Sequence, residues 1–124
     1  MRMEREQQGN GGPIVRGFVG NGFRVDDAIY RALLLTPDAA ADFVAPPLDT
    51  LDEAALQPLI DLRPEFILLG TGATLVRPPV ALVRALEARE IGVEAMDSRA
   101  AARAWGVLRG EGRIIGAAFY PLDA

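Results

Sequence analysis

PEFILLGTGATLVRPPVALVRALEAREIGVEAMD, the stretch from Pro64 to Asp97, decides the fold that this sequence predicts. The continuous apolar run at Glu65–Gly70 is typical of a parallel strand that is covered on both faces. A glycine-rich turn follows, and Pro78-Pro79 begins a helix in which apolar residues recur at helical spacing. Ile91–Met96 then forms a second strand, so the stretch predicts one right-handed βαβ unit.

The segment before this unit predicts a series of short β-strands. Turn sequences at Gly20-Asn21-Gly22 and Asp26-Asp27 separate three apolar runs, and a fourth run follows a Thr-Pro-Asp turn: Ile14–Val19, Phe23–Val25, Ala28–Leu35 and Ala41–Ala45. Asn-Gly between apolar runs favours a hairpin because both residues accept positive φ. Leu33–Leu35 lacks polar alternation, which predicts that this strand is buried on both faces.

Two further helices and a last strand flank the βαβ unit. Thr50 and Glu53 stand at the spacing of a capping box, and Pro58 predicts that the helix they begin is short or kinked. Ser98 is the expected N-cap of the helix Ser98–Arg109, and Arg113–Tyr120 is the expected last strand. We therefore expect a single α/β domain in three layers, with a mixed central sheet and a β-rich N-terminal half, over residues 13–124, and a disordered tail over residues 1–12.

The residue composition excludes several classes of functional site. The 124 residues include no cysteine and no histidine, and every basic residue is arginine. Zinc sites built on thiolate or imidazole, thiol redox chemistry, histidine-based triads and lysine nucleophiles are therefore excluded. We expect no enzymatic activity, no metal and no cofactor.

Charge and hydropathy predict a cytoplasmic protein, and the lack of a transit-peptide pattern leads us to expect a bacterial origin. The net charge is −4, and the chain lacks the basic stripe that nucleic-acid-binding proteins carry. The longest apolar runs, such as Ile114–Tyr120, are far shorter than the roughly 18 residues that a membrane span needs. The first residues show neither the apolar core of a signal peptide nor the pattern of a transit peptide.

Two turns at the carboxyl ends of the predicted parallel strands form the candidate ligand site. The first turn offers backbone N–H groups and a hydroxyl, the second offers a carboxylate, and arginines lie near both in the sequence. A small anion or a nucleotide is the ligand class that this set would bind: Gly70, Thr71, Gly72, Arg77, Asp97, Ser98 and Arg103. The alternative is a tight turn whose glycines relieve backbone strain beside a capped helix, and the weakness of a lone GTG relative to GxGxxG favours it. An enzyme with Asp97 as general base is a third hypothesis.

Trp105, Arg99 and Arg103 form the candidate partner-binding site. Trp105 lies four residues after Ala101 and three before Leu108, which favours a core position; an anchor for a protein partner is the alternative. Arg99 and Arg103 are spaced i, i+4 and share a helix face, which in most proteins is simply solvated.

The segments PEFILLGTG (Pro64–Gly72) and IGVEAMDSRAAARAWGVL (Ile91–Leu108) resemble the Mth938-like domain family, and YRALLLTPD (Tyr30–Asp38) fits the same family. This family includes the mitochondrial NADH dehydrogenase (complex I) assembly factor 3 proteins and many uncharacterised bacterial proteins. Its members carry Cys-Arg and then an aromatic residue and asparagine after the acidic corner. Here Ala102-Arg103 and Trp105-Gly106 stand in those places, so cysteine and asparagine are replaced.

The resemblance implies a three-layer α/β domain without established enzymatic activity that binds other proteins. We therefore expect a non-catalytic interaction protein that assists the assembly of respiratory complex I or other membrane complexes. Complex I subunits or membrane-insertion machinery are the expected partners, and they would hold the chain peripherally at the inner membrane. Such a role predicts an exposed apolar patch of several hundred Å². A homodimer through an edge strand, for example the last strand, is a further expectation.

Overall fold

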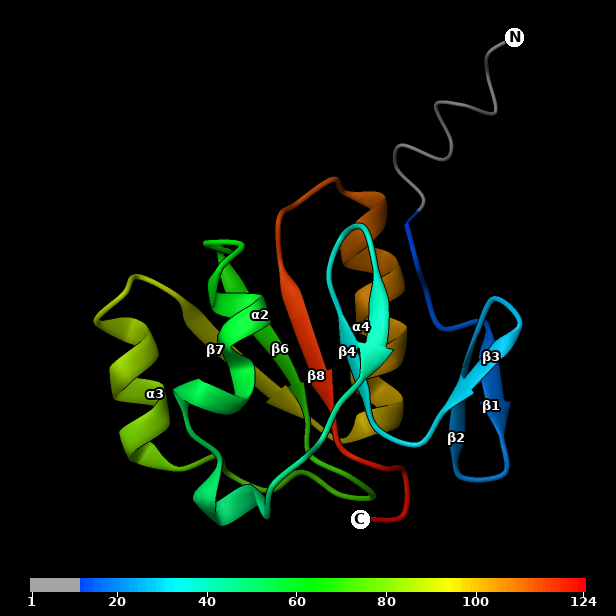
Figure 1. Cartoon of the computed structure of the whole chain (residues 1–124), viewed down its shortest axis with the longest axis horizontal. Coiled ribbons are helices and arrows are strands. Elements are labelled where there is room, and N and C mark those ends of the chain that lie inside the picture. Colours follow the sequence, from blue (N-terminus) through cyan, green and yellow to red (C-terminus); the bar gives the residue numbers. More distant parts are fainter. Residues whose placement is uncertain (1–11) are drawn as a thin grey trace, which may run out of the picture.

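The computed structural model describes residues 12–124, which form two β-sheets with short helices around them (Figure 1). The smaller sheet has the strand order β1-β2-β3, with β1 at Gly17–Val19, β2 at Gly22–Val25 and β3 at Ala28–Tyr30. The larger sheet has the order β5-β4-β8-β6-β7, with β4 at Leu33–Leu35, β5 at Ala40–Asp42, β6 at Phe66–Gly70, β7 at Gly92–Met96 and β8 at Gly116–Phe119. The expected tail at residues 1–12 lies outside the described residues except for Gly12.

The larger sheet is mixed, as the sequence predicts. β6 runs parallel to both β7 and β8, whereas β4 runs antiparallel to β8 and β5. The helical segments are the 3₁₀ helices η1 (Leu48–Thr50) and η2 (Glu53–Leu56) and the α-helices α2 (Gln57–Ile60), α3 (Val80–Glu87) and α4 (Ser98–Gly110). The predicted βαβ unit is therefore confirmed as β6, α3 and β7.

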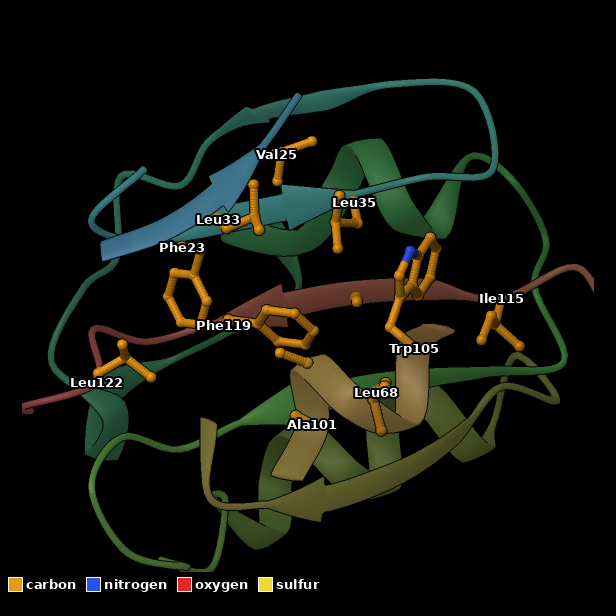
Figure 2. Packing of buried hydrophobic residues seen from close by; sticks show 12 residues of the cluster. Phe23, Val25, Leu33, Leu35, Leu68, Ala101, Trp105, Ile115, Phe119 and Leu122 are labelled. Carbon is orange, nitrogen blue, oxygen red and sulfur yellow. The ribbon is translucent and has the colours of Figure 1, made fainter. Parts of the chain in front are cut away.

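Two hydrophobic clusters cover the two faces of the larger sheet and make the three layers. Successive residues of β6 alternate between them: Leu68 belongs to the cluster with Trp105 of α4, whereas Ile67 and Leu69 belong to the cluster with α2 and α3. Figure 2 shows the first cluster, in which Trp105 and Phe23 approach the sheet from α4 and from the smaller sheet. The smaller sheet and α4 thus share one face, and η2, α2 and α3 cover the other.

The N-terminal strands differ from the expectation in one place. Ala28–Leu35 was expected as one strand, but it divides at Arg31 into β3, which pairs with β2, and β4, which pairs with β5 and β8. The hairpin before it is confirmed, although its loop is Gly20-Asn21 and only Gly20 has a positive φ, of 60°. Burial of Leu33–Leu35 on both faces is also confirmed, since these residues contribute to both clusters.

Two predicted helix caps are wrong by one or two residues. Asp52, not Thr50, caps η2, because Leu51 is extended and separates η1 from η2. Asp97, not Ser98, is the N-cap of α4, and its carboxylate accepts a hydrogen bond from the Ala100 N–H at 2.9 Å. Aspartate serves at both positions because its side chain reaches back to an amide three residues on.

The last strand is shorter than expected and lies at the centre of the sheet. β8 covers Gly116–Phe119 and pairs with β4 on one side and β6 on the other. It therefore has no free edge, and a homodimer cannot form through it in the way that we expected. The edges of the larger sheet are β5 and β7. Within residues 12–124, no helix is both long and apolar enough to cross a membrane, and no group of three potential metal ligands occurs.

Candidate functional site

The candidate ligand site lies at the carboxyl ends of β6, β7 and β8, which point to the lower edge of the sheet in Figure 1. The loop after β6, helix η1 and the C-terminal residues meet at this edge. In open α/β sheets this is the edge where ligands bind, because the strand-to-helix turns open there.

The backbone of the Gly70-Thr71-Gly72 turn is occupied by hydrogen bonds within the chain. The Thr71 N–H donates to the Met96 carbonyl at 2.9 Å, and the Gly72 N–H donates to Ser98 Oγ at 2.8 Å. The next N–H group, of Ala73, donates to the Ala124 carbonyl at 3.1 Å. These three N–H groups therefore do not converge on an open anion site in this conformation.

Ser98 joins three elements at the centre of this edge. Its buried hydroxyl accepts the hydrogen bond from Gly72 and donates to the Tyr120 carbonyl at 2.7 Å, and its N–H donates to the Gly72 carbonyl at 2.8 Å. The turn after β6, the start of α4 and the end of β8 are thereby held together. The Ser98 hydroxyl therefore holds the structure together at this edge, and it is already used both as a hydrogen-bond donor and as an acceptor.

Both glycines of the turn are needed for backbone geometry. A Cβ atom on Gly70 would lie 2.9 Å from Ser98 Oγ and 3.0 Å from the ring of Phe119. Gly72 has a φ of 111°, a conformation that residues with a Cβ rarely adopt. The glycines thus permit the close approach of β6, α4 and β8. This agrees with the alternative interpretation of the motif, a tight turn beside a capped helix.

Thr71 holds the loop that follows. Its buried hydroxyl donates to the Thr74 carbonyl at 2.7 Å and accepts a hydrogen bond from the Val76 N–H at 3.0 Å. These two bonds fix residues 71–76 into a defined loop although the segment belongs to no helix or strand. The loop is therefore presented to solvent in one conformation.

An open hollow of about 650 Å³ lies beside this loop. Its wall is largely apolar and includes Pro46, Val76 and Tyr120, and its polar groups come from Asp49, Thr71 and Arg77, among others. Of the seven predicted ligand-binding residues, Thr71 and Arg77 line this hollow. The other five, Gly70, Gly72, Asp97, Ser98 and Arg103, do not.

Tyr120 forms a rigid part of the wall of this hollow. Its hydroxyl donates to the Pro46 carbonyl at 2.7 Å, and its ring packs edge-on against Phe43 at 5.4 Å between centroids. Burial, assisted by the negative charge of Asp49, raises the pKa of Tyr120 to about 12. The phenol is therefore neutral at physiological pH and acts as a brace between β8 and the segment before η1.

Large aliphatic side chains are exposed on or next to the two chain segments that line the hollow. Leu75 is 61% exposed and Val80 is 64% exposed, and Val76 between them is also exposed. Val44, at 91% exposure, precedes Ala45, which lines the hollow. We call the hollow together with Val44, Leu75, Val76 and Val80 the edge surface. No sequence motif marks these residues as a site; the one available signal is LVRPPV (residues 75–80) after the glycine turn, which is largely apolar.

The predicted partner-binding residues fall in two different environments. Trp105 is fully buried in the core, and its indole N–H donates to the Pro13 carbonyl at 2.8 Å. It therefore cannot contact a partner in this structure, and the core position is confirmed. Arg99 and Arg103 are exposed on α4 and share a face, as predicted, because both guanidinium groups lie over the ring of Phe18.

Comparisons with known proteins place the chain in a family. A family model described as "Protein of unknown function (DUF498/DUF598)" matches residues 15–120. An uncharacterised protein of Rhodobacter capsulatus is 32% identical over 108 residues, which are 87% of this chain and 84% of that protein. The NADH dehydrogenase [ubiquinone] 1 alpha subcomplex assembly factor 3 of Bos taurus is 33% identical over 108 residues. This match covers 86% of the chain but 56% of the bovine protein.

A solved structure shows the same fold. A Bordetella pertussis protein described as a Mth938-like domain superposes with a TM-score of 0.76 at 25% identity, over 90% of this chain and 87% of that one. The resemblance to Mth938-like domains that the sequence motifs indicated is thereby confirmed, together with the mixed α/β fold class.

Proposed function

The chain belongs to the family described as protein of unknown function (DUF498/DUF598), and we propose that it acts as a protein-interaction domain that assists the assembly of a membrane complex such as respiratory complex I. The name of the bovine relative, an assembly factor of NADH dehydrogenase, supports the assembly role. Complex I subunits or membrane-insertion machinery are the partners that this role implies. The chain would then be peripheral to the membrane through those partners.

The observation that carries the proposal is the edge surface. Leu75, Val76 and Val80 are exposed on the segment of residues 75–80, of which Val76 lines the largely apolar hollow. Complete burial of one such side chain is worth roughly 1.5–3 kcal/mol, so a partner that covers the three gains several kcal/mol. Contiguous exposed apolar patches often mark protein-interaction sites, which supports this assignment.

The rigidity of the loop makes this surface suitable for binding. The two hydrogen bonds of Thr71 hold the backbone of the loop, and Pro78 and Pro79 restrict its end. A partner therefore does not have to order the loop when it binds, which lowers the entropic cost of association.

Complementation of a gene deletion tests the proposal. In cells that lack the gene, membranes are assayed for NADH:ubiquinone oxidoreductase activity and for intact complex I on native gels. The wild-type chain is expected to restore both, whereas Leu75→Asp, which places a charge in the edge surface, is expected to fail. Ile29→Asp is the matched control, because Ile29 is 56% exposed on β3 and lies outside the edge surface.

Two outcomes would contradict the proposal at different points. Normal assembly of complex I and of other membrane complexes in the deletion strain would argue against the assembly role. Full restoration by Leu75→Asp, with the protein at wild-type level, would show that the edge surface is not the binding site.

A second candidate function is the binding of a small anion or a nucleotide in the hollow. Arg77 lines it and, among residues 12–124, forms no ion pair, so its charge is open to an anion beside the apolar wall. Thermal unfolding with added phosphate or nucleotides measures this directly. A rise in melting temperature that Arg77→Gln abolishes would support the second candidate, and no rise with any of them would dismiss it.

A further inference from the structure

Phe18 of β1 lies against α4 beneath two arginines. The guanidinium carbon of Arg99 is 4.9 Å from the centroid of the Phe18 ring, and that of Arg103 is 6.0 Å from it. Both distances suit a cation–π contact. The ring therefore holds two positive charges one helical turn apart, at the join between the smaller sheet and α4.

The arginines of this region have no acidic partner in the described part of the chain. The four ion pairs there use Arg31, Arg89 and Arg113, although acidic residues outnumber basic ones by 17 to 13 in the sequence. Arg16, Arg99 and Arg103 take part in none of them, and their side chains make no hydrogen bond within residues 12–124. We call these three arginines and Phe18 the arginine patch.

Helix stability does not explain the position of Arg99. It is in the first turn of α4, and a positive charge there opposes the helix dipole. Arg103 stands one turn later on the same face, so the two charges also repel each other, as like charges at this spacing do. An anion bound between them would relieve both effects.

A small hollow lies inside the patch. It has a volume of about 210 Å³ and is lined by Arg16 and Phe18 on the β1 side and by Ala102 and Arg103 on the α4 side. The space admits an acidic side chain and is too small for a nucleotide. Contact with the Phe18 ring restrains the guanidinium groups, and their N–H donors make no hydrogen bond within residues 12–124. Guanidinium groups with free donors bind carboxylates in a bidentate manner.

We propose that the arginine patch binds an acidic segment of a protein partner, with Asp or Glu side chains pairing with Arg99, Arg103 and Arg16. Two of the arginines lie on α4 and the third, Arg16, directly precedes β1, and this spread suits carboxylates spaced along a peptide rather than a single phosphate group. An anionic membrane suits the patch less well, because a membrane-binding surface needs an exposed apolar side chain beside its positive charges. The nearest exposed apolar side chain in the sequence, Val19, points to the opposite face of β1 from Phe18. This surface is distinct from the edge surface, and the inference does not depend on the assembly role.

Fluorescence anisotropy with a labelled short polyglutamate peptide tests the proposal on the full chain. Arg99→Gln/Arg103→Gln is expected to weaken binding by about tenfold or more, because charge-assisted bidentate hydrogen bonds are lost. Arg99→Lys/Arg103→Lys keeps the charge but loses the planar guanidinium geometry, so its affinity for the peptide is expected to lie between those of the wild type and the glutamine variant. Arg63→Gln/Arg84→Gln removes the same charge from exposed positions outside the patch and should leave affinity within about twofold, as expected for distant surface charges.

Three results would overturn the proposal. The first is no binding of the peptide by the wild-type chain at low salt. The second is an equal loss of affinity in the control variant, which would indicate a response to net charge alone. The third is binding to vesicles of phosphatidylglycerol or to inorganic phosphate that depends on Arg99 and Arg103 while the peptide does not bind. Circular dichroism confirms that each variant is folded before it is scored.

Discussion

Ser98→Ala should destabilise the domain more than any other removal of a single hydroxyl group. The Ser98 hydroxyl is buried and makes hydrogen bonds of 2.8 Å with the Gly72 N–H and 2.7 Å with the Tyr120 carbonyl. Alanine leaves both backbone groups without a partner in a site that is too tight for easy access of water. Each orphaned buried group costs about 1–3 kcal/mol, and single substitutions rarely cost more than about 4 kcal/mol, so we expect the free energy of unfolding to fall by about 2–4 kcal/mol.

Urea unfolding followed by the fluorescence of Trp105 measures this loss. Trp105 is the single tryptophan and is fully buried, so its emission reports on the core. With an m-value of about 2 kcal/mol/M, in the middle of the usual range, the expected loss lowers the midpoint by roughly 1–2 M at an unchanged slope. A domain of this size has about 5–15 kcal/mol of stability, so the variant should still fold.

Thr50→Val provides the matched control. It removes a hydroxyl that donates to the Pro47 carbonyl at 3.0 Å, but at an exposed position where water replaces the bond. We expect it to change stability by less than about 0.5 kcal/mol. If Ser98→Ala is no more destabilising than Thr50→Val, then Ser98 does not hold the edge together and the structural interpretation of the GTG turn fails.

Three further predictions concern strain, packing and pH. Glu90→Gly should stabilise the domain by about 1 kcal/mol in the same urea assay, because Glu90 has a φ of 65° after α3, which glycine adopts without strain; a loss of stability would contradict this. Gly70→Ala should cost about 1–3 kcal/mol, since its Cβ would press on Ser98 and the ring of Phe119, and a neutral effect would show that the corner has room. The pKa of Tyr120 is raised from 10 to about 12, so the stabilisation that the neutral phenol gives is complete below pH 10 and is lost as the pH rises toward 12. A titration followed by tyrosinate absorbance should show one tyrosine that ionises near pH 12, and this tyrosine should be missing in Tyr120→Phe; its ionisation near pH 10 would contradict the prediction.

Local sequence signals were sufficient for the βαβ unit. The apolar run of β6, the prolines before α3 and the second run at β7 each specify their element without help from distant residues. The N-terminal strands were harder, because Ala28–Leu35 divides according to its partners. Leu33 pairs with Phe119, more than eighty residues away, and no local pattern contains that information.

The turns of the candidate site lie at the predicted edge of the sheet, but the sequence did not show which hydrogen bonds their backbone groups make. The GTG motif marks a close approach of three elements. The sequence could not show that the N–H groups of Thr71, Gly72 and the following Ala73 donate to Met96, Ser98 and Ala124. Ser98 was expected as a cap, but its hydroxyl serves Tyr120 instead, 22 residues further along the chain. The exposed aliphatic residues were missed because apolar residues in sequence predict burial, and only the fold shows that Leu75 and Val80 are not buried.

Site-specific photo-crosslinking from position 75 tests the central claim most directly. A photoreactive residue replaces Leu75 in one variant and Ile29 in the other, the crosslinks are formed in the cells that encode the chain, and the captured proteins are identified by mass spectrometry. The account predicts that position 75 captures subunits or assembly proteins of one membrane complex and that position 29 does not. Capture of the same proteins from both positions, or of none from position 75, would contradict the assignment of the edge surface as the partner-binding site.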